Sequence, residues 1–149
     1  MSLIVLIVWF TTALGGLYML AVWLIENDAA DRGTAASRLP VPVITAHLLL
    51  AITGLAVWVA YLLLGRRVLA WAALAILVAI ALLGITMFAR WIPVYRGPAV
   101  TAGAGQAPGA VTRMPAERNF PVVIVAAHGL LAASTLVLVL LIVLGVGNS

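Results

Sequence analysis

Two histidines, His47 and His128, are the residues of this chain best suited to chemistry, and both lie inside long apolar segments. Each follows a proline, Pro40 or Pro121, by seven residues. An imidazole in a hydrocarbon environment is costly and usually has a function. One histidine repeated at the same depth on two helices indicates a pair of ligands for a group held between those helices.

The chemistry that this pair suits best is axial ligation of one haem b per chain, with two imidazoles binding the iron from opposite faces of the ring. Such ligation requires histidines at one depth on facing, non-adjacent helices. A ligating histidine also needs an acceptor for its other ring nitrogen. We expect that acceptor one turn back on the same helix, at the carbonyl of Val43 or Ile124.

Further residues of the flanking segments fit the surroundings of a haem. Glycines leave room for the ring edges, methionines lie at the level of the histidines, and arginines suit propionates because of their fork geometry. The expected haem contacts are Gly16, Gly84, Met19 and Met87, and the expected propionate partners are Arg38, Arg118, Arg90 and Arg96. Interfacial anchoring explains each arginine taken singly equally well.

Two other interpretations of the histidines stay open in the sequence. In the first there is no cofactor, and the imidazoles hydrogen-bond each other, or Thr45 or Ser134, and hold the helices together. In the second, His47 and His128 bind Cu(I) together with the thioethers of Met19 and Met87. A structural or assembly subunit and a copper-binding or transport protein are the corresponding functions.

Composition narrows the class of protein. Hydrophobic residues make up 66% of the chain and charged residues 8%, which excludes an ordinary soluble domain. Cysteine is absent, so thiolate metal sites and covalent haem attachment are excluded. The net charge of +4 comes from scattered arginines and does not indicate a nucleic-acid partner. The sequence holds no recognisable nucleophile–base pair, which favours an electron-transfer or accessory subunit over a self-contained enzyme.

Four segments are long enough to cross a bilayer, which requires about 20 apolar residues. We expect helices near 3–25, 41–64, 68–91 and 120–144, and a flexible Gly/Ala/Pro-rich loop over 92–119. The predicted fold is all-α, a single transmembrane four-helix bundle over residues 1–149, in an integral multi-pass protein of the plasma membrane, or of the inner membrane in a bacterium. Arginines are more numerous in the loops on the histidine side, which favours a cytoplasmic position for that side.

The helices also repeat one another. Gly, Met, Ala and Trp recur in the same register near the ends of the first and third helices, as Gly16, Met19, Ala21 and Trp23 and as Gly84, Met87, Ala89 and Trp91. Together with the proline–histidine spacing, this repeat predicts two copies of a helix pair. Their pseudo-two-fold axis would run along the membrane normal, with the histidines as symmetry mates.

A four-helix membrane unit with one histidine on each of two facing helices resembles the membrane b-type cytochromes. These include cytochrome b561-like proteins, the anchor subunits of succinate dehydrogenases and each half of haem A synthase. The resemblance is architectural and covers the helical core. It implies that His47 and His128 ligate haem b, which passes electrons between quinone and a partner protein.

The chain departs from that class in one respect, because many members carry two haems and this chain has one histidine pair. The resemblance therefore implies a one-sided relay, a quinone-facing anchor or a haem-binding subunit, in contact with lipid and part of a larger membrane complex or homo-oligomer.

Overall fold

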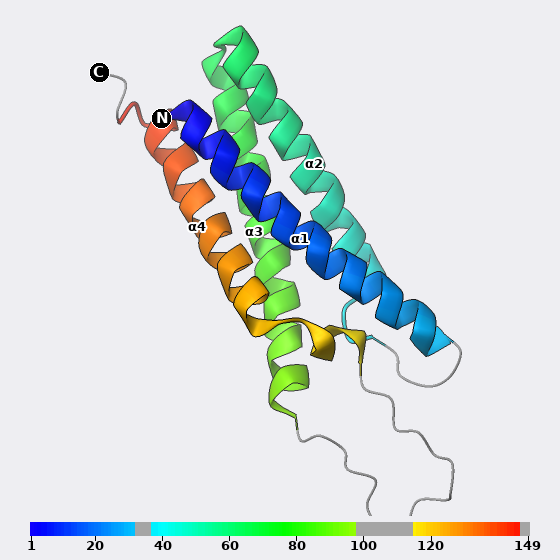
Figure 1. Ribbon diagram of the computed structural model, residues 1–149. Helices are drawn as coiled ribbons and strands as arrows, with labels where there is room; N and C mark the ends of the chain where they lie inside the picture. The colour runs from blue at the N-terminus through cyan, green and yellow to red at the C-terminus, as the bar shows by residue number, and fades with distance from the viewer. Residues whose placement is uncertain (32–36, 98–114, 147–149) are drawn as a thin grey trace, which may run out of the picture.

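The structure, a computed structural model, describes residues 1–31, 37–97 and 115–146. These ranges contain helices and no strand (Figure 1). The elements are α1 (Ser2–Asp31), α2 (Val41–Leu64), α3 (Arg67–Arg96), the short 3₁₀ helix η1 (Ala116–Asn119) and α4 (Val122–Val143). The prediction of an all-α fold with four long helices is confirmed over the described residues.

Two of the predicted boundaries and part of the predicted loop need correction. Helix α1 continues to Asp31, and α3 continues through Pro93 to Arg96. A proline in the last turn of a helix removes one hydrogen bond and does not have to end the helix. Part of the segment expected to be a flexible loop forms η1, whereas residues 98–114 of that segment lie outside the described residues.

The two histidine helices begin in the same way. Pro40 and Pro121 precede α2 and α4 in extended conformations, with φ −67° and ψ 125° for Pro40 and φ −64° and ψ 122° for Pro121. Their carbonyls accept the first helical N–H groups, from Val43 and Ile44 in α2 and from Ile124 and Val125 in α4. A proline at this point costs little, because its missing N–H would have no partner inside the helix.

The turn between α2 and α3 is tight because of Gly65. This glycine has φ +65°, in the left-handed region that residues with a Cβ rarely adopt, and its N–H donates to the carbonyl of Tyr61. Helix α3 starts at Arg67 and runs antiparallel to α2 (Figure 1).

The four helices form two closely packed pairs. Helix α2 packs mainly against α3, and α1 packs mainly against α4. Contacts between the pairs are sparser, and those between α1 and α2 are the sparsest. Within the four described helices, α2 and α4 make no direct backbone contact and lie diagonally opposite each other. The histidines therefore belong to different pairs.

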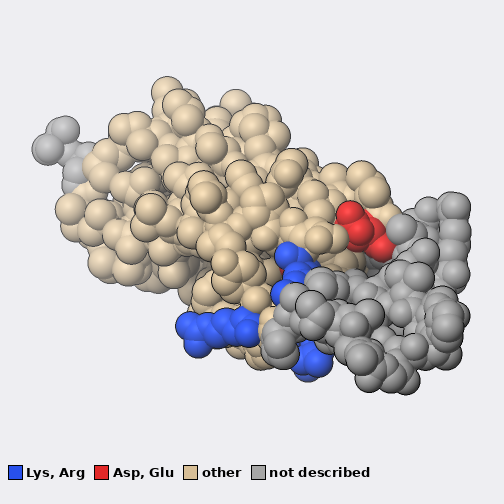
Figure 2. Space-filling view, turned by 60° about the horizontal axis from the view of Figure 1, so that its bottom comes forward, with Lys and Arg blue, Asp and Glu red and all other residues tan. Residues whose placement is uncertain are grey.

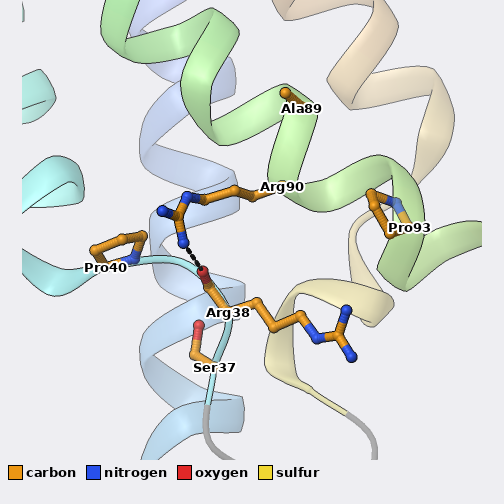
Figure 3. A pocket seen from close by; sticks show the side chains of 6 residues that line it. All are labelled: Ser37, Arg38, Pro40, Ala89, Arg90 and Pro93. Carbon is orange, nitrogen blue, oxygen red and sulfur yellow. Dashed lines mark hydrogen bonds between the residues drawn. The ribbon is translucent and has the colours of Figure 1, made fainter.

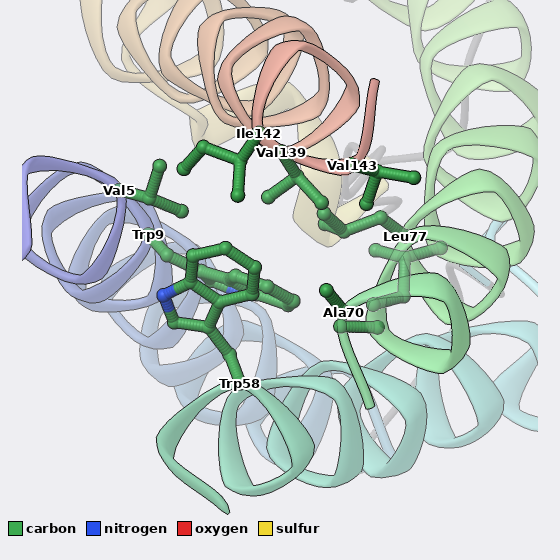
Figure 4. Packing of buried hydrophobic residues seen from close by; sticks show 10 residues of the cluster. Val5, Trp9, Trp58, Ala70, Leu77, Val139, Ile142 and Val143 are labelled. Carbon is green, nitrogen blue, oxygen red and sulfur yellow. The ribbon is translucent and has the colours of Figure 1, made fainter. Parts of the chain in front are cut away.

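One end of the bundle, where α1 begins and α4 ends, is filled by a large apolar cluster (Figures 1 and 4). Its buried members, called the end core below, are Val5, Trp9, Trp58, Ala70, Ala73, Leu77, Ile80, Val139, Ile142 and Val143. The indoles of Trp9 and Trp58 have their ring centres 6.3 Å apart, and Trp58 is fully buried. Bulky side chains thus occupy the bundle interior at this end.

The outer surface of the bundle is mostly apolar. All four long helices are long and apolar enough to cross a membrane, and many of their leucine, isoleucine, valine and phenylalanine side chains face outward. Figure 2 shows the arginines of one face gathered towards one end of the molecule, with a wide uncharged area beside them.

Candidate functional site

The structure brings His47 of α2 and His128 of α4 together inside the bundle. Their ring centres are 6.4 Å apart, and the ring planes make an angle of 53°. Both side chains are half-buried. Because each histidine follows its proline by the same number of residues and both helices start alike, the two imidazoles meet at one level.

The Nδ1 atom of each histidine is held by a backbone carbonyl of the neighbouring helix. His47 Nδ1 lies 3.1 Å from the oxygen of Ile80 in α3, and His128 Nδ1 lies 2.9 Å from the oxygen of Thr12 in α1. A carbonyl oxygen only accepts, so Nδ1 carries the proton in both rings. The lone pair of each neutral imidazole is therefore on Nε2, the nitrogen that remains available to a ligand.

The prediction that the acceptors are the carbonyls of Val43 and Ile124, on the histidines' own helices, is wrong. Thr12 and Ile80 were not among the site residues predicted from the sequence. The signal that could have found them is the pair of glycines one turn further along, at Gly16 and Gly84. A helical side chain covers the turn that precedes it, so a glycine leaves the carbonyl four residues earlier open to a neighbouring side chain.

The glycines contact the imidazoles directly. A Cβ built on Gly16 would lie 3.1 Å from His128 Cε1, and one on Gly84 would lie 3.4 Å from His47 Cε1. Gly15 is also close to His128, with its Cβ position 3.6 Å from Nδ1. The glycines predicted to leave room for a ring thus also fix how closely α1 and α3 approach the histidines.

The histidines lie between two apolar clusters. On one side is the end core, which includes Ile80. On the other side Trp23, Leu39 and Ala116 form a smaller cluster, against which Leu20, Ile44, Met87 and Phe120 pack. Met87 therefore packs against this smaller cluster. Met19 is half-buried on α1.

The hydroxyls considered as histidine partners are engaged elsewhere. Thr45 donates to the carbonyl of Val41 at 3.0 Å, and Ser134 donates to that of Leu130 at 2.9 Å. Each bond stays within its own helix. The suggestion that these hydroxyls hold the histidines is therefore wrong.

A polar network closes the histidine end of the bundle around Glu117, which the sequence analysis did not single out. The carboxylate of Glu117 accepts from the Ser37 hydroxyl at 2.9 Å and from the backbone N–H of Arg38 at 2.6 Å. Trp23 Nε1 donates to Ser37 Oγ at 2.9 Å, and Trp91 Nε1 donates to the Glu117 carbonyl at 3.0 Å. A single carboxylate in a loop sequence gives no signal of such burial.

The structure brings two of the four predicted propionate arginines together. Arg38 and Arg90 line an open hollow of about 560 Å³ with Ser37, Pro40, Ala89 and Pro93 (Figure 3). Arg90 Nη1 donates to the Arg38 carbonyl at 3.4 Å. Arg118 instead donates to the Gly97 carbonyl at 3.2 Å, and Arg96 is exposed at the last residue of α3.

Comparisons of the chain with protein families, with curated proteins and with solved structures found no match. The function is therefore inferred from the site itself.

Proposed function

We propose that this chain is a multi-pass membrane protein that holds one haem b between His47 and His128 and uses it for electron transfer. One observation carries the proposal. Two imidazoles from diagonally opposite helices have their ring centres 6.4 Å apart, and each has its Nδ1 hydrogen bonded to a carbonyl, with no hydrogen-bond partner for its Nε2 among the described residues. This arrangement is the usual one for metal-ligating histidine.

The distance between the rings fits two axial ligands on one metal. Imidazole nitrogen binds a transition metal at about 2.0 Å, and the ring centre lies roughly 1.2 Å behind that nitrogen, so two axial imidazoles have centres about 6.4 Å apart. The observed separation is 6.4 Å. A direct N–H···N bond would bring the ring centres to about 5.3 Å, so the rings are too far apart to bond each other.

The division of the bundle into two pairs suits a flat ligand. His47 of α2 is hydrogen-bonded to α3, and His128 of α4 is hydrogen-bonded to α1, so each histidine is held within its own pair. Contacts between these pairs are the sparser ones in the bundle. A planar group between the pairs would meet one imidazole on each face.

Haem explains the site better than a bare metal ion. No group of three or more His, Cys, Asp or Glu side chains that could hold a metal occurs in the described part of the chain. A haem needs only two protein ligands, because its own ring supplies four nitrogens. Copper would require the thioethers of Met19 and Met87, and Met87 packs against the cluster of Trp23, Leu39 and Ala116.

The internal repeat supports the same interpretation. The register that pairs Gly16 with Gly84 also pairs the two carbonyls that hold the histidines, Thr12 with Ile80. It pairs other buried residues as well, Val5 with Ala73, Trp9 with Leu77 and Trp23 with Trp91.

The register that pairs the histidines likewise pairs the fully buried Trp58 and Val139. We propose a duplicated helix pair with a pseudo-two-fold axis between its copies.

Each residue of the site then has a defined task. A bound haem supplies reversible one-electron chemistry at its iron. His47 and His128 hold the ring from both faces, and Gly16 and Gly84 keep the carbonyl acceptors of the imidazoles open. Arg38 and Arg90, which line one hollow, would hold the propionates. Quinone or a partner protein would exchange electrons at the histidine end, in a larger membrane complex or homo-oligomer.

The first test is the visible spectrum of the full chain, purified in detergent, in the oxidised and dithionite-reduced states, with a pyridine haemochrome assay. We expect a sharp Soret band, a reduced α-band and about one haem per chain. His47→Ala and His128→Ala should each abolish the low-spin bis-histidine spectrum. Full haem content with an unchanged low-spin spectrum in either variant would contradict the proposal, as would a protein that stays colourless after haem reconstitution.

A second candidate function is that of a cofactor-free structural subunit of a membrane complex. The observation that favours it is that the same Nδ1 bonds tie α2 to α3 and α4 to α1 without any ligand. Under this function the histidine variants would lower the unfolding temperature of a protein that has no chromophore to lose.

A further inference from the structure

Glu117 is a fully buried acidic side chain at the histidine end of the bundle, with 0% of its surface exposed. Its two carboxylate oxygens are both used: one accepts the Ser37 O–H and the other the Arg38 N–H. A buried carboxylate is costly unless its hydrogen bonds are made. These bonds are therefore strong constraints on the segments that they join.

The joined segments lead directly into the two histidine helices. Ser37 and Arg38 stand just before Pro40, where α2 begins, and Glu117 stands in η1 just before Pro121, where α4 begins. One carboxylate therefore connects the starting points of α2 and α4, which make no direct backbone contact with each other in the described helices. Since a helix advances by 1.5 Å per residue, its start fixes the depth of its histidine.

The connection reaches the other two helices as well. Trp23 of α1 donates to Ser37, and Trp91 of α3 donates to the Glu117 carbonyl. Both indoles are largely buried, and Trp23 and Trp91 occupy matching positions in the proposed repeat. All four helices are thus tied to one small network.

All hydrogen-bonding positions of the Ser37 hydroxyl are in use, so this residue serves as a fixed link. Its Oγ accepts from Trp23 Nε1 and from the Leu39 N–H, while its own hydrogen goes to Glu117. A hydroxyl has one donor and two acceptor positions. With all three in use, Ser37 cannot pass a proton from the adjoining hollow to Glu117 unless a bond breaks, which favours a positioning task over a proton relay.

We infer that Glu117 is a positioning residue that sets the depth of His47 relative to His128. The bridging itself is independent of any ligand. Its consequence for metal ligation rests on the proposed haem function.

The absence of cysteine from the chain allows a clean distance measurement. Val41→Cys and Val123→Cys place spin labels at exposed positions in the first turns of α2 and α4. In the haem-free full chain in lipid nanodiscs, we expect a single narrow distance distribution between the labels. Glu117→Ala should lose that narrow distribution, and Glu117→Gln, which keeps one carbonyl oxygen as acceptor, should recover part of it.

Val139→Ala is the matched control, because Val139 is fully buried in α4 but lies in the end core. It should lower stability and leave the label distance unchanged. If Glu117→Ala does not fold, Ser37→Ala removes one of the two bridges and should broaden the distribution. An unchanged narrow distribution in Glu117→Ala, or in Ser37→Ala where that variant replaces it, would overturn the inference.

The haem-loaded protein gives a second readout. Glu117→Ala should lose low-spin character in favour of high-spin haem, Glu117→Gln should restore part of it, and Val139→Ala should keep it. The label distances test the bridge even if wild-type protein binds no haem. A failure of the haem proposal and a failure of the Glu117 inference are therefore distinguishable.

Discussion

At the scale of single residues, the histidine site depends on two glycines, which have no side chain, as much as on the imidazoles. Gly16 and Gly84 leave open the carbonyls of Thr12 and Ile80, to which the two Nδ1–H groups donate. The glycines were recognisable from the sequence as a matching pair. The carbonyls could be found only through these glycines, four residues further along, because every residue carries a carbonyl and the packing of α1 and α3 against the histidines selects these two.

Substitution of the site glycines tests this dependence. In Gly16→Ala the new methyl group would press on His128 Cε1 at 3.1 Å, and in Gly84→Ala it would press on His47 Cε1 at 3.4 Å. We expect Gly16→Ala to cost about 1–3 kcal/mol of stability, with a smaller loss for Gly84→Ala. Thermal unfolding in detergent measures the effect.

Gly129→Ala is the control for both variants, because a Cβ there meets nothing within 4 Å although the residue adjoins His128. It should be neutral or slightly stabilising, since alanine is the better helix former. Equal losses in all three variants would mean that contact with the imidazoles is not the cause.

The arginines separate into two groups that the sequence did not distinguish. Arg38 and Arg90 line the hollow of Figure 3, whereas Arg96 is exposed at the end of α3. We expect Arg38→Ala and Arg90→Ala each to speed haem loss by roughly fivefold, about 1 kcal/mol, with little effect from Arg96→Ala. The rate of haem transfer to an apoprotein acceptor measures the difference. Equal rates for all three variants would mean that the hollow is not part of the proposed haem site.

At the scale of elements, the helices were largely predictable. The proline starts of α2 and α4 follow from the restricted φ of proline, and Gly65 marks the tight turn before α3. The end of α3 was not predictable, because the sequence does not show that Pro93 falls in a last turn that tolerates it. The 3₁₀ helix was missed because its position depends on the burial of Glu117, a tertiary effect.

A tight contact of Gly54 in α2 with Trp9 of α1 and Ile76 of α3 gives an element-scale prediction. A Cβ on Gly54 would lie 2.9 Å from Trp9 Cζ2 and 3.0 Å from Ile76 Cγ2. Gly54→Ala should therefore overpack this contact and cost about 1–3 kcal/mol of stability, without changing the proposed haem ligation by the histidines. Unfolding temperature and spectrum, measured on one sample, test both parts. A loss of low-spin haem at unchanged stability would contradict this separation of the two ends.

At the scale of the whole molecule, the two ends of the bundle differ in content. The end core fills one end with apolar side chains and two closely spaced indoles (Figure 4). The other end contains the histidines, the Glu117 network and the hollow lined by Arg38 and Arg90. The larger apolar cluster is thus separated along the helix axes from the Glu117 network, and only Ile80 belongs both to the end core and to the histidine site. Substitutions elsewhere in the end core should therefore leave the histidine end intact.

In the proposed membrane-spanning arrangement, the depth of the histidines has an electrical consequence. His47 lies about a quarter of the way along α2 from its start, and His128 about a quarter of the way along α4. An electron that reaches a group between them from the near surface crosses only about a quarter of the voltage drop, worth about 0.6 kcal/mol per 100 mV. The midpoint potential measured in energised vesicles should therefore shift by roughly a quarter of the applied voltage. A shift close to three quarters of the applied voltage would mean that electrons enter from the opposite side, through the end core.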